Sequence, residues 1–283
     1  MKTPRSTSYT TVSLVHRSSI GTLALRWLVV ASAACVGGLC LAGCSGGASV
    51  DPGAGGGASS TSSATGGGGG MMPANLGVKS FASVDGQGKI LGVGAVVPVK
   101  SFENVPDFDP AFKGTIGIEM PESVRDKTFI QLLRINWLSG GHGPSPYGAP
   151  HFDLHFYRGT KDEVDAITCS DTSPFPAEIL VSSYETPTTC VAAMGYHAWP
   201  TADIVTGTFS ASIILGYAAQ KMVFIEPMVT RALFLSRKSF ELAIPRPASA
   251  GGAQTLYPSH LTATYDAATD AYTFELNQFE TID

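Results

Sequence analysis

The segment Pro150–Tyr157 alternates strictly between polar and apolar side chains. Successive side chains of an extended strand point to opposite faces, so we expect His151, Asp153 and His155 on one face. The intervening residues, which we expect in the hydrophobic core, are Phe152, Leu154 and Phe156. Imidazoles and carboxylates bind Zn²⁺ or Fe²⁺ and also transfer protons. The polar face of this strand is therefore the first candidate for a functional site.

The spacing along a strand limits which of these groups can act together. At about 3.3 Å per residue, His151 and His155 lie about 13 Å apart and cannot hold one ion. Neighbours two positions apart, at about 6.6 Å, can converge on a metal. We therefore expect Asp153 to work with one of the two histidines, joined by His197 or by Glu226, which ends the apolar run MVFIE. Such a set would suit Zn²⁺ or Fe²⁺ and leave one position open for water or a ligand.

His142 is a secondary candidate, because it lies in a glycine-rich loop, 139–144, that can approach a site closely. A hydrogen-bonded structural network, without any metal, is the alternative for all of these polar residues. Four aromatic residues near the histidines in sequence either wall a pocket for a small ligand or belong to the core. They are Trp137, Tyr147, Tyr157 and Trp199.

The elements that must position these side chains are mostly strands. Apolar or alternating runs at hairpin spacing, with few helical signals, predict a mainly β domain with a few short helices. We expect this domain to be a single sandwich or barrel, of which a cupin-like barrel is one form. The expected strands are 78–84, 90–97, 115–120, 129–138, 151–157, 208–217, 222–226, 261–265 and 271–276. A capping-box pattern at Thr160 predicts a short helix over 161–167, and we expect a second over 228–236.

The N-terminal part of the chain resembles a bacterial lipoprotein precursor. Residues 1–43 combine a basic region with a short apolar run, and LAGC, ending at Cys44, follows the pattern in which the cysteine is lipidated. Residues 44–74 would form a Gly/Ser-rich tether, and 75–283 a single globular domain. These features predict export and a lipid anchor in the cell envelope, at the outer membrane if there is one. An ordinary signal peptide or an uncleaved anchor are the alternatives.

The cysteines and charges fit an exported protein. Once 1–43 is removed and Cys44 is lipidated, only Cys169 and Cys190 remain, which predicts one disulfide, with two buried thiols as the alternative. The chain has a net charge of −5, and all acidic residues lie after residue 43, which argues against nucleic-acid binding. Phosphate-loop, nucleophile-elbow and HExxH motifs are absent from the sequence.

Several motifs together resemble a family of bacterial exported proteins of unassigned activity, typified by a Thermus protein under a sigma-E/anti-sigma-E system. They are Gly141–His142, Pro150–Tyr157 with its HFDxHFY signature, Met194–Trp199 and Phe224–Met228. The likeness spans about 75–240. In the family pattern an acid follows the first histidine and His-Trp are adjacent, whereas here Gly143 and Ala198 occupy those places. The resemblance implies a domain type and an envelope setting, not a reaction.

Three functions remain open from the sequence. The first is an envelope lipoprotein that binds a metal or a small ligand. The second is a metal-dependent enzyme, a hydrolase or a cupin-like oxygenase, in which Asp153 or Glu226 acts as base. The third is a structural surface protein, for which homo-oligomers would be expected.

Overall fold

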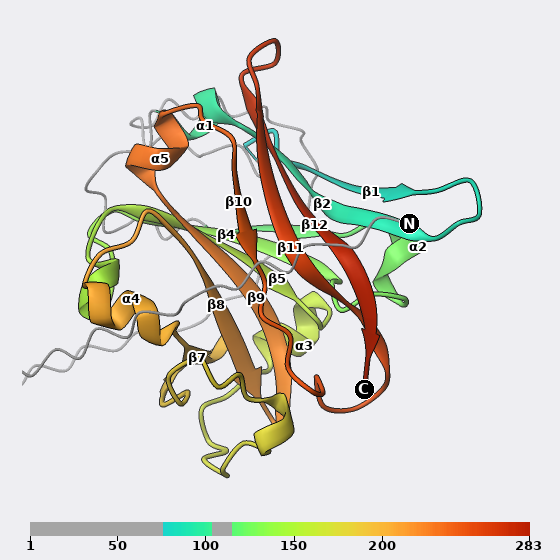
Figure 1. Cartoon of the computed structure of the whole chain (residues 1–283), viewed down its shortest axis with the longest axis vertical. Coiled ribbons are helices and arrows are strands. Elements are labelled where there is room, and N and C mark those ends of the chain that lie inside the picture. The colour runs from blue at the N-terminus through green and yellow to red at the C-terminus, as the bar shows by residue number, and fades with distance from the viewer. Residues whose placement is uncertain (1–75, 104–114) are drawn as a thin grey trace, which may run out of the picture. The chain divides into compact units, whose positions relative to one another are not determined.

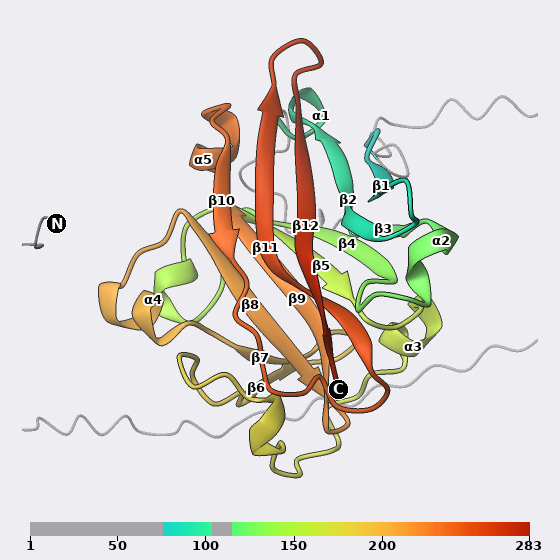
Figure 2. The same ribbon diagram turned by 45° about the vertical axis from the view of Figure 1, so that its right-hand side comes forward.

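The computed structural model describes residues 76–103 and 115–283, and two antiparallel β-sheets dominate it (Figure 1). The sheets pack face to face as a sandwich, with the long β11–β12 hairpin lying across the strands of the other sheet (Figure 2). The mainly β prediction is confirmed. Of its two forms the sandwich is the correct one, because neither sheet closes into a barrel within the described residues.

The larger sheet carries the histidine-rich strand near its middle. Its seven strands run in the order β3-β4-β5-β9-β8-β7-β6, all antiparallel. Their bounds are β3 Thr115–Glu119, β4 Leu132–Leu138, β5 His151–Tyr157, β6 Thr189–Val191, β7 Gly195–Ala198, β8 Ala211–Ala218 and β9 Lys221–Thr230. Strand β5 is buried along its whole length, because both of its faces are covered.

The smaller sheet closes the other side of the core. Its five strands run in the order β1-β2-β12-β11-β10. Their bounds are β1 Lys79–Val84, β2 Ile90–Pro98, β10 Phe240–Ala243, β11 Thr255–Asp266 and β12 Ala271–Ile282. Strands β11 and β12 are longer than the apolar runs that predict them. Cross-strand pairing therefore extends a strand well beyond its apolar centre.

Short helices join the strands. They are α1 Val99–Glu103, α2 Glu122–Arg125, α3 Lys161–Asp165, α4 Thr201–Thr206 and α5 Arg231–Leu235, with 3-10 turns at Ser145–Tyr147 and Ala177–Ile179. The capping box of Thr160 and Glu163 is present and begins α3. The prediction of a helix over 228–236 is wrong for its first three residues. These residues pair with β5 or β8 and complete β9, so α5 starts at Arg231.

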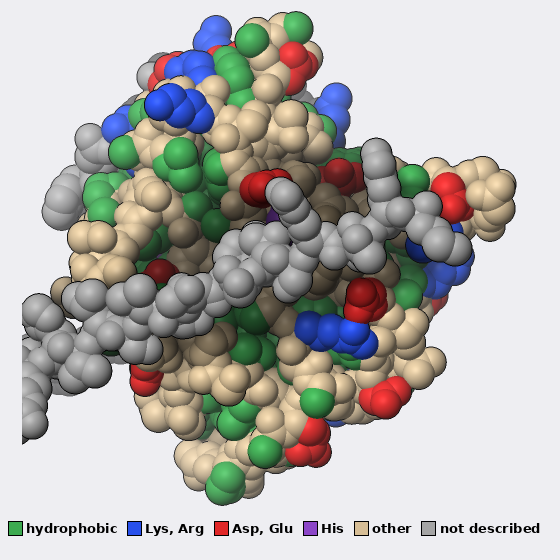
Figure 3. All heavy atoms as spheres, viewed as in Figure 1, with side chains coloured by type: hydrophobic (Ala, Val, Ile, Leu, Met, Phe, Trp, Pro, Cys, Tyr) green, Lys and Arg blue, Asp and Glu red, His purple; other side chains and the backbone are tan. Residues whose placement is uncertain are grey.

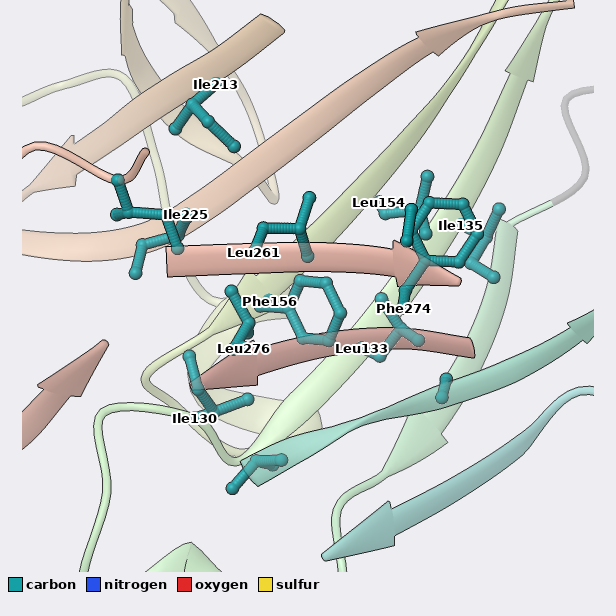
Figure 4. Close-up of a cluster of buried hydrophobic side chains, with 14 of the residues drawn as sticks. Ile130, Leu133, Ile135, Leu154, Phe156, Ile213, Ile225, Leu261, Phe274 and Leu276 are labelled. Carbon is teal, nitrogen blue, oxygen red and sulfur yellow. The ribbon is translucent and has the colours of Figure 1, made fainter. Parts of the chain in front are cut away.

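The hydrophobic core lies between the two sheets. Phe156 and Leu154 of β5 meet Phe274 and Leu276 of β12 there (Figure 4). Phe152 belongs to the same cluster, so the expected apolar face of β5 is confirmed. The opposite face of β5 is consequently free to carry the polar side chains, under a second layer of loops.

The predicted disulfide is present, since Cys169 and Cys190 are bonded with their Cα atoms 5.8 Å apart. The predicted signal, lipidation site Cys44 and tether lie outside the described residues. Among the helices of the described ranges, none has the length and apolarity to cross a membrane. Acidic and basic side chains are interspersed over the face shown in Figure 3.

Candidate metal centre

The outer face of the seven-stranded sheet holds the polar side chains of β5. His151, Asp153 and His155 are each at most 4% exposed. A second apolar cluster, which includes Tyr147 and Trp199, packs over this face and excludes water from much of it. Burying so many ionisable groups is costly unless they are paired or bind a metal, so their partners decide what the site can do.

The first set of converging groups consists of His142, His151 and Asp153. Each offers one ligand atom, and these atoms all lie within 4.8 Å of one another. His151 Nε2 is 3.1 Å from Asp153 Oδ1, and His142 Nε2 is 3.9 Å from Asp153 Oδ2. Two imidazoles and one carboxylate at this spacing form a donor set typical of catalytic Zn²⁺ sites and of Fe²⁺ oxygenases.

Backbone contacts fix how the two imidazoles of this first set are oriented. His151 Nδ1 lies 2.6 Å from the carbonyl oxygen of Ala149, and His142 Nδ1 lies 2.7 Å from that of Gly143. A carbonyl only accepts, so Nδ1 of each ring carries a proton, and it is Nε2 of each ring that faces Asp153. Metal-binding histidines typically donate their other ring N–H to a backbone carbonyl in this way.

The atoms that face each other in the first set make no hydrogen bond. His151 Nε2 and Asp153 Oδ1 are buried and have no hydrogen-bond partner, although they are 3.1 Å apart. In the neutral tautomer, the lone pair of Nε2 would be repelled by the carboxylate oxygen unless a cation lay between them. A cation bound there would satisfy both atoms.

A glycine turn brings His142 to β5. Gly141 has φ +63°, and a Cβ atom there would lie 2.3 Å from the carbonyl oxygen of Tyr147. The His142 N–H donates to that same carbonyl at 2.9 Å, which closes the loop. Only glycine fits this conformation and this approach together, so the loop is built to bring His142 over the sheet.

The second set consists of His155, His197 and Glu226, whose ligand atoms also lie within 4.8 Å of one another. Glu226 Oε1 is 3.5 Å from His155 Nε2, and Glu226 Oε2 is 3.9 Å from His197 Nε2. Because Phe156 of β5 pairs with Ile225 of β9, Glu226 lies across from His155 in the same register. All three residues are more than 90% buried.

Packing explains how His197 reaches this set from the far side of β8. His197 pairs with Gly216 of β8, and Gly216 pairs in turn with Phe224 of β9. The Phe224 ring lies over Gly216, where a Cβ atom would approach the ring within 2.0 Å. The centroid of the same ring lies 5.0 Å from the ring centroids of both His155 and His197, so it supports the two imidazoles from one side.

Burial sets the charge state of the second set. It lowers the pKa of His155 to about 3 and that of His197 to about 4, so both imidazoles are neutral near pH 7. Burial, and then the charge of Asp153, raise the pKa of Glu226 well above its ordinary value. Both ring nitrogens of His155 and Glu226 Oε2 also have no hydrogen-bond partner. These atoms are therefore available to bind an ion.

Polar contacts hold the surrounding layer in place. Tyr147 donates a hydrogen bond of 2.9 Å to Asp203 of α4, and Ser212 donates to the same carboxylate. Arg134 of β4 bonds Asp165 and donates to the carbonyl of Ala193, at the turn that precedes β7. These bonds connect the cover of the site to the sheet beneath it.

The structure brings all the predicted residues to one face, but in a different grouping. His151 and His155 do belong to separate sets, as the strand spacing predicts. The expectation that Asp153 is joined by His197 or Glu226 is wrong, because His142 fills that place and the other two join His155. The glycine-rich loop is the sequence signal for His142.

The four aromatic residues divide between the two expected roles. Trp199 lines a cavity above the two sets, whereas Trp137 packs in the sandwich core. Tyr147 and Tyr157 belong to the apolar cluster on the outer face. Phe209, which the sequence does not single out, packs 5.4 Å from the His151 ring and 5.0 Å from the Tyr147 ring.

Comparisons with family models, with curated proteins and with solved structures found no match for this chain. Each set offers three potential ligand atoms and would leave at least one coordination position, an arrangement that lets a bound ion polarise a ligand or activate water.

Proposed function

We propose that this protein binds divalent metal ions, Zn²⁺ or Fe²⁺, at two neighbouring sites on the outer face of the seven-stranded sheet. One ion would be held by His142, His151 and Asp153. The other would be held by His155, His197 and Glu226. The observation that carries the proposal is the pair His151 Nε2 and Asp153 Oδ1, buried 3.1 Å apart without a hydrogen bond, while Ala149 fixes the His151 tautomer.

The alternative of a structural network fits these contacts poorly. Buried polar groups in a stable network satisfy one another's hydrogen bonds, and an unpaired one costs about 1–3 kcal/mol. Here atoms of both sets are buried without a hydrogen bond, among them His151 Nε2, Asp153 Oδ1, His155 Nε2 and Glu226 Oε2. A cation at each set would satisfy these atoms together, which supports metal binding.

Metal content tests the proposal directly. The full chain, incubated with Zn²⁺ or Fe²⁺ and dialysed, should retain two ions per molecule. Asp153→Ala should retain one while staying folded, since the apolar face of β5 is unchanged. His260→Ala is the matched control, because His260 lies on β11 in the other sheet, pairs with Glu241, and should not affect metal content. A metal-free wild type, together with a large loss of stability in Asp153→Ala, would establish the structural network instead.

We further propose that the domain is exported and anchored to the cell envelope by a lipid on Cys44. The basic region, the apolar run and LAGC support this, as does the resemblance to exported bacterial proteins. Cys44→Ser should release the protein from membranes or block its processing. Unchanged mass and complete membrane association of that variant would exclude lipidation.

A further inference from the structure

A cavity of about 630 Å³ opens above both metal sets. His142 and Asp153 of the first set line it, together with all three residues of the second. The remainder of its lining is largely apolar. The apolar residues are Leu138, Pro144, Val191, Met194 and Trp199. A cavity of this size, lined by apolar side chains and a few polar groups, is typical of sites for small organic molecules.

The charges in this cavity constrain what it can hold. Asp153 and Glu226 are its only acidic residues within the described ranges, and neither Lys nor Arg lines it. Without metal, the Asp153 carboxylate would repel an anion and no cationic side chain of the lining would attract one. With two divalent ions, four positive charges would face two negative ones, which leaves an excess of two positive charges in a largely buried site. Such an excess is unfavourable in a medium of low dielectric constant.

We infer that the cavity binds a small molecule with an oxyanion head, a carboxylate or a phosphate, on an apolar body. The head would occupy the open coordination position of the ions and neutralise their excess charge. The body would pack against Trp199, Met194 and Val191. This inference rests on the proposed metal binding, because the ions supply the positive charge that the cavity's own side chains lack.

Calorimetry with three probes of equal chain length tests the head group. Octanoate, octyl phosphate and 1-octanol would each be titrated into the zinc-loaded full chain and into the chain stripped with a chelator. At least one of the two anions should bind the zinc-loaded protein about tenfold more tightly than 1-octanol does. The better anion identifies the head group as carboxylate or phosphate. The stripped protein should show the reverse order, with 1-octanol bound more tightly than either anion.

The zinc content of the same samples separates the two proposals. A protein that holds two ions but binds 1-octanol as tightly as both anions would overturn this inference and leave metal binding intact. A wild type that holds no zinc would overturn metal binding, and this inference with it. Anion binding that does not change when the metal is removed would also overturn the inference.

A matched pair of variants tests the apolar wall. Val191→Asn places a polar group on the wall of the cavity, whereas Val205→Asn makes the same change on α4, where Val205 is 80% exposed and does not line the cavity. Val191→Asn should weaken binding of the preferred anion about threefold or more, because apolar contact is lost. Val205→Asn should leave that affinity unchanged. Equal effects of the two variants would contradict the proposed location of the apolar body.

Discussion

Replacing Glu226 by Gln should have opposite consequences with and without metal. Glu226 is 1% exposed, and burial together with the charge of Asp153 raises its pKa, so its protonated form is favoured when no metal is bound. Gln has the shape of that protonated acid. The variant should therefore match or exceed wild-type stability in a chelator, within about 1 kcal/mol. In zinc it should lose the stabilisation that an ion bound at the second set provides.

The size of that loss follows from linkage between binding and folding. A ligand at 100 times its dissociation constant stabilises the folded state by about 2.7 kcal/mol. In a domain of this size each kcal/mol shifts the melting temperature by about 2–4 °C. Glu226→Gln should thus melt about 5–10 °C below wild type in zinc and at or above wild type in the chelator.

Thermal melts of the two proteins in zinc and in chelator make the comparison. Glu241→Gln is the control, since Glu241 is an exposed carboxylate that also pairs with a histidine, and it should behave like wild type in both conditions. If Glu226→Gln lowers the melting temperature equally with and without zinc, Glu226 is a structural residue and the reasoning is refuted.

Three further predictions concern the fold around the site. His155 and His197 have pKa values of about 3 and 4 in the folded protein, below the ordinary 6.5, so the unfolded chain binds more protons as the pH falls below about 6.5. In the metal-free Glu226→Gln variant, which removes the opposite contribution of the raised Glu226 pKa, folding should therefore lose about 1–2 kcal/mol per histidine between pH 7.5 and 5 in urea titrations, and a constant urea midpoint would contradict the buried neutral state. Cys190→Ser opens a disulfide between residues 21 apart and should cost about 3 kcal/mol of unfolding free energy, measured against the wild type under oxidising conditions. Gly216→Ala forces a methyl group into the Phe224 ring and should reduce zinc content from two ions toward one, whereas full retention of both ions would show that the ring does not support the second set.

Much of the fold, and the set of residues that form the candidate site, can be predicted from the sequence. The alternation over 151–157 predicts both the strand and which side chains face the core, because a strand has a period of two. The same geometry separates His151 from His155, and the structure confirms that separation. The mainly β class follows from the many short apolar runs, whose pairing only tertiary structure decides.

The grouping of ligands depends on contacts that spacing does not encode. Whether Asp153 meets His142 or His197 is determined by a loop that folds back through Gly141 and by the order of strands in the sheet. The short strands β6 and β7 have little apolar pattern of their own and form through pairing with β8 and with each other. The extension of β9 through Thr230 likewise comes from its partners β5 and β8, which override the local helical preference.

The most direct test of metal binding is a crystal structure of the zinc-soaked protein, with anomalous scattering recorded at the zinc edge. Two anomalous peaks are predicted, one within coordinating distance of His142, His151 and Asp153 and the other of His155, His197 and Glu226. Asp153→Ala should lose the first peak and keep the second. Well-ordered side chains at both sets with no anomalous peak at either would contradict the account.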